Sequence, residues 1–358
     1  MKTRLATIMA EQDLGASGTK IIDINIKDVI SRITVKFYAQ NVDVVYLAHP
    51  VANIEKIELV DGSDVLFSLT GFQAQALNFY DRGKVPFTYL NVRDDGGQQA
   101  QCGMDFGRVL FDPVLAFDPT KFINPQLKIT FDRTNANAGC LTSNCEVLAD
   151  IFDEDPPTPT GFLMSKEIYS YTVGTTGYEY IDLPTDYVTR QIFAKAFLAP
   201  WGMTGIFDAF KLSEDNDKRV PVDVTSSVLE KRAFETYGPV EEWVKAVVSI
   251  GGIDFYGMPT DGAFGVISPE VVLQDVGVES VGGGKYRFEA EAAVYRARAV
   301  LIGNCPHGTI PLLPKPGPEI TDWYDVTKLG SLKLRIDDGA EDADTYTGEV
   351  MVQQYRPF

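Results

Sequence analysis

The chain has 358 residues, of which 45% are hydrophobic, and it carries a formal net charge of −18. This length suits two domains better than one, and the negative charge argues against nucleic-acid binding, because phosphate contacts need clustered Lys and Arg. No run of roughly 18 apolar residues occurs and the apolar stretch after Met1 is short and broken, so we expect no membrane-spanning helix, no secretory signal, and synthesis in a cytoplasm.

The N-terminal segment differs in charge from the rest of the chain. The first 36 residues carry six Lys and Arg and four acidic residues, a local charge of +2, so the remainder carries −20. We expect residues 1–19 to form an arm outside the first domain. The alternative is a disordered tail, because chain termini are commonly disordered.

The chain reads as a mainly β protein. Short runs rich in Val, Ile, Thr, Phe and Tyr alternate with Gly, Pro, Asn and Asp, which is typical of strands separated by turns. Examples are Ser31–Tyr38, Gln191–Phe197 and Lys285–Ala290.

A strand–turn–strand–helix unit occurs twice in the sequence. The first copy contains residues 54–83 and the second residues 207–238, and an acidic turn follows the first strand of each. Apolar residues at helical spacing predict helices over 71–80 and 227–237, and both end at a Gly.

A second pair of similar segments follows the first pair, in the same order in both copies. Residues 118–131 and 325–336 each contain an Asp-x-Thr-Lys turn and a Leu-Lys strand, and residues 146–151 and 349–354 each form a further apolar strand. The matched residues of these segments lie 203 to 207 positions apart. A separation of that size indicates a tandem of related domains, not a short-period solenoid.

The two copies differ in length and are joined by a proline-rich segment. From Leu59 to Leu127 the chain covers 68 residues, whereas from Leu212 to Leu332 it covers 120. We place the excess of about 52 residues in surface loops near 249–285, where glycine is frequent. Three prolines within 153–160 indicate a stiff linker. The predicted domains are therefore residues 20–155 and 161–358, with the linker at 156–160.

No motif of catalysis or cofactor binding is present. His49 and His307 stand in turns beside proline without a recognisable partner, and the P-loop, GxSxG and HExxH patterns are absent. We therefore predict no enzymatic activity, and no catalytic, cofactor-binding or metal-binding residues.

Two acidic stretches and one pair of cysteines leave alternatives open. Asp153–Asp155 and Asp337–Asp344 are interpreted as solvated loops, with calcium binding as the alternative. Cys140 and Cys145 are interpreted as free thiols, with a small disulfide loop as the alternative.

Two β domains, each with a short loop helix, fit best as two tandem eight-stranded jelly-roll β-sandwiches in an all-β protein. This arrangement resembles the double jelly-roll major capsid proteins of tailless icosahedral, PRD1-like, membrane-containing viruses and phages. The resemblance is carried by the repeated units 54–83 and 207–238, by the repeated endings 118–131 and 325–336, and by the final Gln353–Pro357. It covers most of residues 30–358.

The resemblance implies a structural protein of the virion. Its expected partner is itself, first as a homotrimer and then through lattice contacts between trimers. Each trimer would be a pseudo-hexameric tile of an icosahedral shell. Other expected partners are a vertex protein and an internal lipid membrane, the latter contacted by the N-terminal arm. The insertion is expected on the outer side of the particle, and no cofactor or nucleic acid is expected to bind.

Two other classes of function are alternatives to the hypothesis of a virion structural protein. A carbohydrate-binding or adhesin-like β-sandwich would use Trp201, Tyr256 and Trp323 to stack on sugars. A glycoside hydrolase on a jelly-roll scaffold would need two carboxylates across a cleft.

Overall fold

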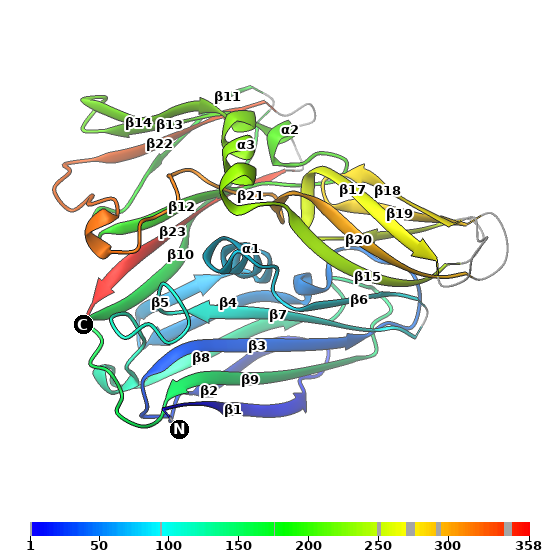
Figure 1. The fold of residues 1–358 in the computed structure, drawn as a ribbon, viewed down its shortest axis with the longest axis horizontal. Helices are drawn as coiled ribbons and strands as arrows, with labels where there is room; N and C mark the ends of the chain where they lie inside the picture. Colours follow the sequence, from blue (N-terminus) through cyan, green and yellow to red (C-terminus); the bar gives the residue numbers. More distant parts are fainter. Residues whose placement is uncertain are drawn as a thin grey trace.

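The computed structural model describes residues 2–93, 95–174, 176–248, 252–269, 276–290, 295–339 and 346–358. Its elements form two stacked β-sandwiches, with the N-terminal half at the bottom of Figure 1 and the C-terminal half at the top. No helix in the described ranges combines the length and the hydrophobicity needed to cross a bilayer.

The first sandwich contains two four-stranded sheets of order β1-β9-β3-β7 and β2-β8-β4-β5. Its strands are β1 (Thr3–Asp13), β2 (Ser17–Asp23), β3 (Ile30–Gln40), β4 (Ile54–Asp61), β5 (Asp64–Leu69), β7 (Gly97–Asp105), β8 (Pro125–Asp132) and β9 (Thr142–Phe152). Helix α1 (Gly71–Arg82) and a short strand β6 (Thr88–Val92) lie between β5 and β7. The short 3-10 helices η1 (Pro50–Asn53) and η2 (Pro119–Lys121) precede β4 and β8.

These strands form because their sequences alternate between a core face and an outer face. In β3, Ile33, Val35 and Phe37 are at most 1% exposed, while the residues between them are half-buried. Period-2 alternation is what one sheet of a sandwich requires, because successive side chains point to opposite faces.

The second sandwich contains sheets of order β10-β23-β12-β21 and β11-β22-β13-β14. Its strands are β10 (Gly161–Thr172), β11 (Gly177–Asp182), β12 (Thr189–Lys195), β13 (Phe207–Glu214), β14 (Arg219–Thr225), β21 (Thr309–Pro311), β22 (Leu332–Asp338) and β23 (Thr347–Pro357). Its helices are α2 (Met203–Ile206), α3 (Ser226–Tyr237) and the 3-10 helix η3 (Ile320–Asp322).

The two sandwiches repeat one topology. When β1 to β5 are matched in order with β10 to β14, α1 falls on α3, and β7, β8 and β9 fall on β21, β22 and β23. Both sheet orders then become identical. The repeated sequences 54–59 and 207–212 fall on β4 and β13, as the duplication requires. The prediction of two eight-stranded jelly rolls is therefore confirmed. Each has a helix in the predicted loop, and the second also contains the short helix α2.

The insertion is built from strands instead of surface loops. Between α3 and β21 lie β15 (Val240–Val248), β16 (Ile253–Tyr256), β17 (Pro259–Pro269), β18 (Val276–Gly282), β19 (Lys285–Ala290) and β20 (Tyr295–Pro306). The first sandwich has only β6 at this place. Strands β16, β19 and β18 form a separate sheet, and β15, β20 and β17 extend the sheet of the first sandwich. The insertion thus runs beyond the expected 249–285, because β20 must pair with both β15 and β17.

Two parallel strand pairs join the sandwiches. Strand β5 pairs with β10, where Phe67 lies opposite Ser165, and β6 pairs with β15, where Leu90 lies opposite Val244. Two eight-stranded sheets therefore run through both halves of the molecule. The core of the first sandwich accordingly includes Phe193 from the second.

The N-terminal segment departs from the sequence expectation of an arm over residues 1–19. Strand β1 begins at Thr3 and pairs along β9, and β2 begins at Ser17. The physical reason is that Ala6 and Met9 of β1 are buried in the core of the first sandwich. That sandwich therefore begins near residue 3 and not at residue 20. At its other end, β9 stops at Phe152 and β10 starts at Gly161, so we still propose a domain division at 156–160.

Candidate functional site

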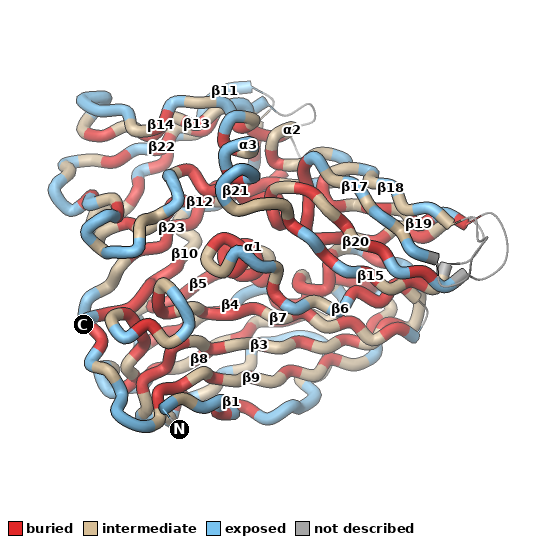
Figure 2. The backbone as a smooth tube through the Cα atoms, viewed as in Figure 1, coloured by how far each residue is buried: buried red, intermediate tan, exposed pale blue. Residues whose placement is uncertain are grey.

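Helix α1 lies at the junction of the two sandwiches. Thr70 and Gln73 form a capping box at its start, with hydrogen bonds of 3.3 and 2.8 Å, and Gly83 ends it in a left-handed conformation at φ 64°. Nine of its twelve residues are buried, and Figure 2 shows the helix mostly red. A surface helix normally buries one face only. Helix α1 is therefore covered on opposite sides by the two halves of the molecule.

Polar side chains of α1 bind groups in the second sandwich. Gln73 Nε2 donates to Glu349 Oε2 at 2.6 Å and also to Glu167. Gln75 Oε1 lies 2.9 Å from His307 Nε2. Buried polar groups cost free energy unless they are hydrogen-bonded. This network therefore fixes how the sandwiches sit on one another.

The same ion pair occurs in both sandwiches. Lys195 Nζ lies 2.9 Å from Glu349, and Lys36 Nζ lies 3.1 Å from Glu146. The strand registers make the pairs equivalent, since Lys195 is opposite Glu349 and Lys36 is opposite Glu146. The second-sandwich side chains are 7% and 13% exposed, whereas the first-sandwich side chains are 25% and 24% exposed. Helix α1 covers the former pair through Gln73.

The two histidines, predicted as isolated turn residues, meet at this junction. Their ring centroids are 4.7 Å apart and both side chains are buried. His49 Nε2 lies 2.9 Å from Glu242 Oε1, and Glu242 Oε2 accepts from Met258 N at 2.7 Å. Burial lowers the pKa of His307 well below its ordinary value. Both oxygens of Glu242 thus have protein partners within the buried junction.

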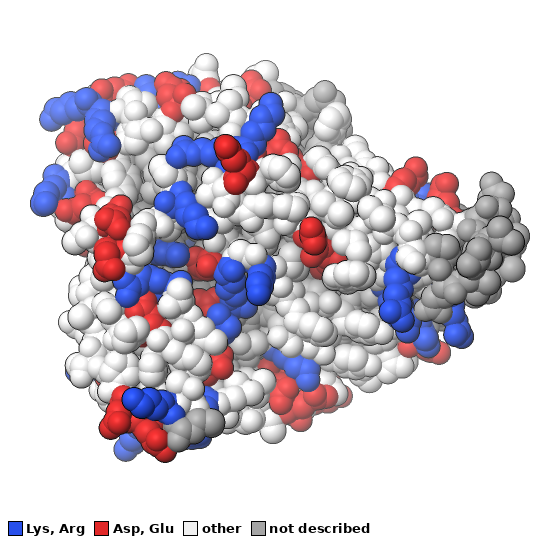
Figure 3. Space-filling view, viewed as in Figure 1, with Lys and Arg blue, Asp and Glu red and all other residues white. Residues whose placement is uncertain are grey.

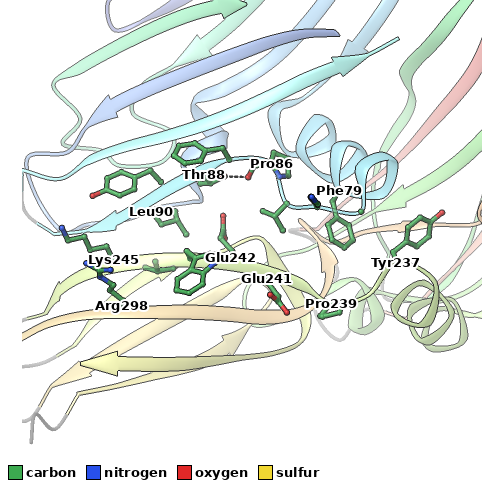
Figure 4. Close-up of a pocket in the computed structure, with 17 residues that line it drawn as sticks. Phe79, Pro86, Thr88, Leu90, Tyr237, Pro239, Glu241, Glu242, Lys245 and Arg298 are labelled. Carbon is green, nitrogen blue, oxygen red and sulfur yellow. Dashed lines mark hydrogen bonds between the residues drawn. The ribbon is translucent and has the colours of Figure 1, made fainter. Parts of the chain in front are cut away.

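A cleft of about 890 Å³ opens beside the junction, between the segment after α1 and strand β15 (Figure 4). Apolar and aromatic residues dominate its walls, among them Phe79, Val85, Pro86, Phe87, Tyr89, Leu90, Tyr237, Pro239, Trp243 and Val244. Glu241, Lys245 and Arg298 are charged residues of its lining. The cleft is therefore a largely apolar groove whose lining also includes the charged Lys84 and Glu242.

The apolar character of this groove continues along the sheet. Trp243 lies opposite Val300, and Val300 lies opposite Val266 on the next strand. Tyr89, the residue before Leu90, extends this row onto β6. Trp243 is 67% exposed, and Figure 3 is largely white over β6 and the first part of β15. Contiguous exposed apolar surface of this kind marks interaction sites in soluble proteins.

The repeated acidic turns have a structural role. The Asp61 carboxylate accepts hydrogen bonds from the backbone N–H groups of residues 123–124, at 3.1 and 2.7 Å. Asp215 Oδ1 accepts from the N–H groups of residues 330–331, at 2.8 and 3.0 Å. The same carboxylate contact therefore fixes the turn before β8 in one sandwich and the turn before β22 in the other.

Two of the other acidic residues considered as possible calcium ligands also have protein partners. Asp153 pairs with Arg4 at 2.8 Å, and Asp338 accepts from Gly174 N at 2.9 Å. Residues 340–344 of the second acidic run lie outside the described residues. Elsewhere in the described chain, no group of three or more His, Cys, Asp or Glu side chains could hold a metal ion.

The four cysteines are buried and free. Cys140 and Cys145 are thus not bridged, although their spacing left a disulfide loop open. Burial raises the pKa of the Cys145 thiol to about 12. Since the thiolate is the reactive form, this thiol is inert at neutral pH.

The three aromatic residues considered for sugar binding belong to different parts of the core. Trp323 is buried with Leu115, and its Nε1 donates to Gly317 O at 2.9 Å. Trp201 packs against the core of the second sandwich, and Tyr256 against that of the insertion. They form no shared platform on which a sugar could stack. The sequence reasoning also overlooked the exposed Trp243, because no pattern distinguishes it from a core residue.

Comparison of the sequence with known proteins finds no matching family model and no matching curated protein. The structure is similar to solved structures over nearly its whole length. The major capsid protein of Sulfolobus turreted icosahedral virus matches with a TM-score of 0.59 and 12% identity, covering 99% of this chain and 97% of that chain. Major capsid protein P2 of bacteriophage PM2 matches with a TM-score of 0.57 and 11% identity, covering 99% and 98%.

A third similar structure is VP54 of PBCV-1, fitted into a reconstruction of the virophage Sputnik. It matches with a TM-score of 0.56 and 11% identity, and the match covers 99% of this chain and 93% of VP54. At these identities the likeness shows a common fold. The chain has the double jelly-roll fold of these proteins.

Proposed function

We propose that this chain is the major capsid protein of an icosahedral virus, a structural subunit without catalytic activity whose place is in the virion. The observation that carries the proposal is the duplication: two jelly rolls of identical sheet order in one chain. The similar solved proteins include two major capsid proteins, and each is matched over nearly its whole length.

The duplication would allow three chains to form a nearly six-fold unit of a shell. Three chains with two similar sandwiches each supply six similar units, so a ring of three chains approximates a hexagonal tile. Such a ring needs large side-to-side interfaces. The exposed apolar row through Trp243 and the apolar groove beside it are surface of the kind that such interfaces bury.

Two measurements on the purified chain test the proposal. Sedimentation should show a homotrimer, and electron microscopy at rising protein concentration should show hexagonal arrays or closed shells. Trp243→Glu should weaken assembly, because it places a charge in the apolar row. The matched control, Ile123→Glu, changes a residue that is 97% exposed in a loop and should assemble normally. A monomer that forms no ordered assembly at any concentration would contradict the proposal.

A closed shell adds two further partners to the proposal. Fivefold positions cannot be filled by a ring of six similar units, so a separate vertex protein is expected there. An underlying anionic membrane would be met by the basic N-terminal segment, whose Lys and Arg are attracted to anionic lipid. Arg4, Arg32 and Lys36 already pair with acidic side chains. Lys20 donates to Gln12, so Lys2 and Lys27 are the residues to test.

The membrane part is tested by flotation with anionic vesicles. Deletion of the N-terminus is unsuitable, because β1 is part of the first sandwich. Lys2→Gln combined with Lys27→Gln should lower vesicle binding while leaving the trimer intact. Equal flotation of the variant and the parent chain would remove the membrane contact from the proposal.

A further inference from the structure

We infer that copies of this chain associate head to tail by repeating the β5–β10 junction between molecules. Strand β14 of one copy adds in parallel to strand β1 of the next, and helix α3 covers the β3–β9 face of that next copy. The inference rests on the proposed function, because it specifies which surfaces close the trimer.

The strand edges provide the first argument. Within one chain, the edge of the first sandwich at β5 is covered by β10 of the second. The topological match turns β5 into β14 and β10 into β1. Both of these strands stand at the end of their sheets, and Figure 1 places β1 at the bottom of the molecule and β14 at the top. An exposed strand edge is a template for pairing with another chain.

The register of the junction carries over to these edges. Phe67 lies opposite Leu59, and Val222 lies opposite Leu212, so Val222 is the equivalent of Phe67. Ser165 lies opposite Gln353, and Leu5 lies opposite Asp150. Alignment of the repeated segments 146–151 and 349–354 makes Leu5 the equivalent of Ser165. The intermolecular junction should therefore place Leu5 opposite Val222.

Burial supports this register. Ser165 is 2% exposed, whereas its equivalent Leu5 is 62% exposed in the single chain. Leu5 is an apolar residue on an edge strand, and a neighbouring β14 would cover it. This difference in exposure is expected if the Ser165 junction forms within the chain and the Leu5 junction forms only between chains.

The two helices provide the second argument. Helices α1 and α3 have the same length, both follow a Thr and both end at a Gly, so Val228 occupies the place of Gln73. Gln73 is 0% exposed because the second sandwich covers it, whereas Val228 is 49% exposed. Figure 2 likewise shows much of α3 exposed. Helix α3 thus keeps a bare face where α1 has its partner.

The repeated ion pair provides the third argument, from the receiving surface. Helix α1 covers Lys195 and Glu349 of the second sandwich through Gln73. The equivalent pair, Lys36 and Glu146, lies on the outer face of β3 and β9 and is about a quarter exposed. A neighbouring α3 would cover it in the same way, with Val228 in place of Gln73.

A head-to-tail contact of this kind either closes into a ring or continues as a filament. In a shell that needs six similar units per tile, the repeated junction closes after three chains. Every β14 edge is then paired with a β1 edge of the neighbouring chain. The contact is heterologous, so each chain uses both of its surfaces with different neighbours.

Chemical cross-linking tests the contact directly. Leu5→Cys and Val220→Cys place thiols on exposed edge residues that are diagonal neighbours in the expected parallel register. A strand spacing of about 4.8 Å and a rise of about 3.3 Å per residue put them roughly 8 Å apart. The four native cysteines are buried, so a short bismaleimide should react with the introduced thiols. Trimers of the double variant should give covalent dimers and trimers on denaturing gels. A mixture of the two single variants should give dimers only.

The control variant combines Leu5→Cys with Tyr178→Cys. Tyr178 is exposed on β11, which lies three strands from β14, about 14 Å, at the opposite edge of the same sheet. This variant should not cross-link. Trimers that sediment normally but show no Leu5–Val220 product, or equal product with Tyr178, would overturn the inference and leave the proposed trimer standing. A parent chain that never forms trimers would overturn the proposed trimer itself.

A second variant tests the helix. Val228→Glu should raise the concentration needed for trimer formation by about tenfold or more, because it buries a charge against Glu146 of the neighbour. Val281→Glu, at an exposed position of the insertion, is the matched control and should leave the trimer unchanged. An intact trimer in the Val228 variant would contradict the placement of α3.

Discussion

Asp61 and Asp215 occupy equivalent positions in the two sandwiches, and each stabilises the same kind of turn. Each accepts two backbone hydrogen bonds from the segment before the penultimate strand of its sandwich. We expect Asp61→Ala and Asp215→Ala each to lower the free energy of unfolding by roughly 1 kcal/mol, since the N–H groups lose a fixed acceptor. Urea unfolding of the two variants measures this. Asn at either position retains an acceptor oxygen and should restore much of the loss; equal losses for Asn and Ala would contradict this account.

His307 makes stability depend on pH. Burial, followed by the nearby charges of His49 and Lys195, lowers its pKa in the folded protein. Above about pH 6.5 the imidazole is neutral in both states and contributes no pH dependence. Below that value the unfolded chain takes up a proton that the folded protein does not, so stability falls as pH falls.

The comparison of the parent chain with His307→Gln isolates this effect. Carboxylates titrate in both chains, so the thermal midpoint should depend on pH in both. Between pH 7 and pH 5 the midpoint of the parent should fall more steeply, because only the parent has the His307 contribution. Gln keeps a polar group that can face Gln75. Parallel pH profiles for the two chains would show that His307 does not titrate on unfolding.

These residue-level features were only partly visible in the sequence. The acidic turns were recognised as a repeat, but their hydrogen bonds were not, because the acceptors and donors are more than 60 residues apart. The histidine pair was missed for the same reason: His49 and His307 come together through the packing of two domains. Local pattern cannot report a contact that tertiary packing creates.

Helices α1 and α3 are equivalent elements in different surroundings. Gln73→Ala should lower the free energy of unfolding by about 1–3 kcal/mol, because it removes the donor that Glu349 uses in a buried site. Val228→Ala at the equivalent position of α3 should change the stability of the monomer by less than about 0.5 kcal/mol, since the side chain is largely exposed. Urea unfolding at low protein concentration makes the comparison. Similar losses at both positions would show that the helices are not asymmetrically buried.

Sequence reasoning predicted the helices well and the insertion less well. Apolar spacing and terminal glycines set the helix positions locally, so α1 and α3 were found close to their bounds. Strands β16 to β18 were predicted as glycine-rich loops, because several turns, such as the Gly282–Gly284 hairpin, dominate the composition of this segment, whereas Lys285–Ala290 was predicted as a strand and forms β19. Strand β1 was predicted as an arm because of the positive charge of the N-terminal segment; the burial of Ala6 and Met9 in the core depends on pairing with the distant β9, which local pattern does not show.

The two sandwiches depend on each other for a complete core. The core of the first includes Phe162, Met164, Phe193 and Met351 from the second. We therefore expect residues 1–157 expressed alone to aggregate, since α1 and the β5 edge would be exposed. Co-expression with residues 158–358 should give a soluble complex, measured by the soluble fraction and by size-exclusion chromatography. A soluble, cooperatively unfolding fragment 1–157 would show that the first sandwich is self-sufficient.

The insertion makes the two halves of the chain unequal, and this inequality would affect the symmetry of an assembly. Only one sandwich of each chain carries strands β16 to β20. A ring of three such chains would therefore repeat its surface pattern every third of a turn, while its outline repeats every sixth. Rotating the ring by one sixth leaves the outline in place but exchanges decorated and bare corners. In a shell built from such rings, each tile would accordingly have two possible orientations, and the insertion would supply the surface by which neighbouring tiles distinguish them.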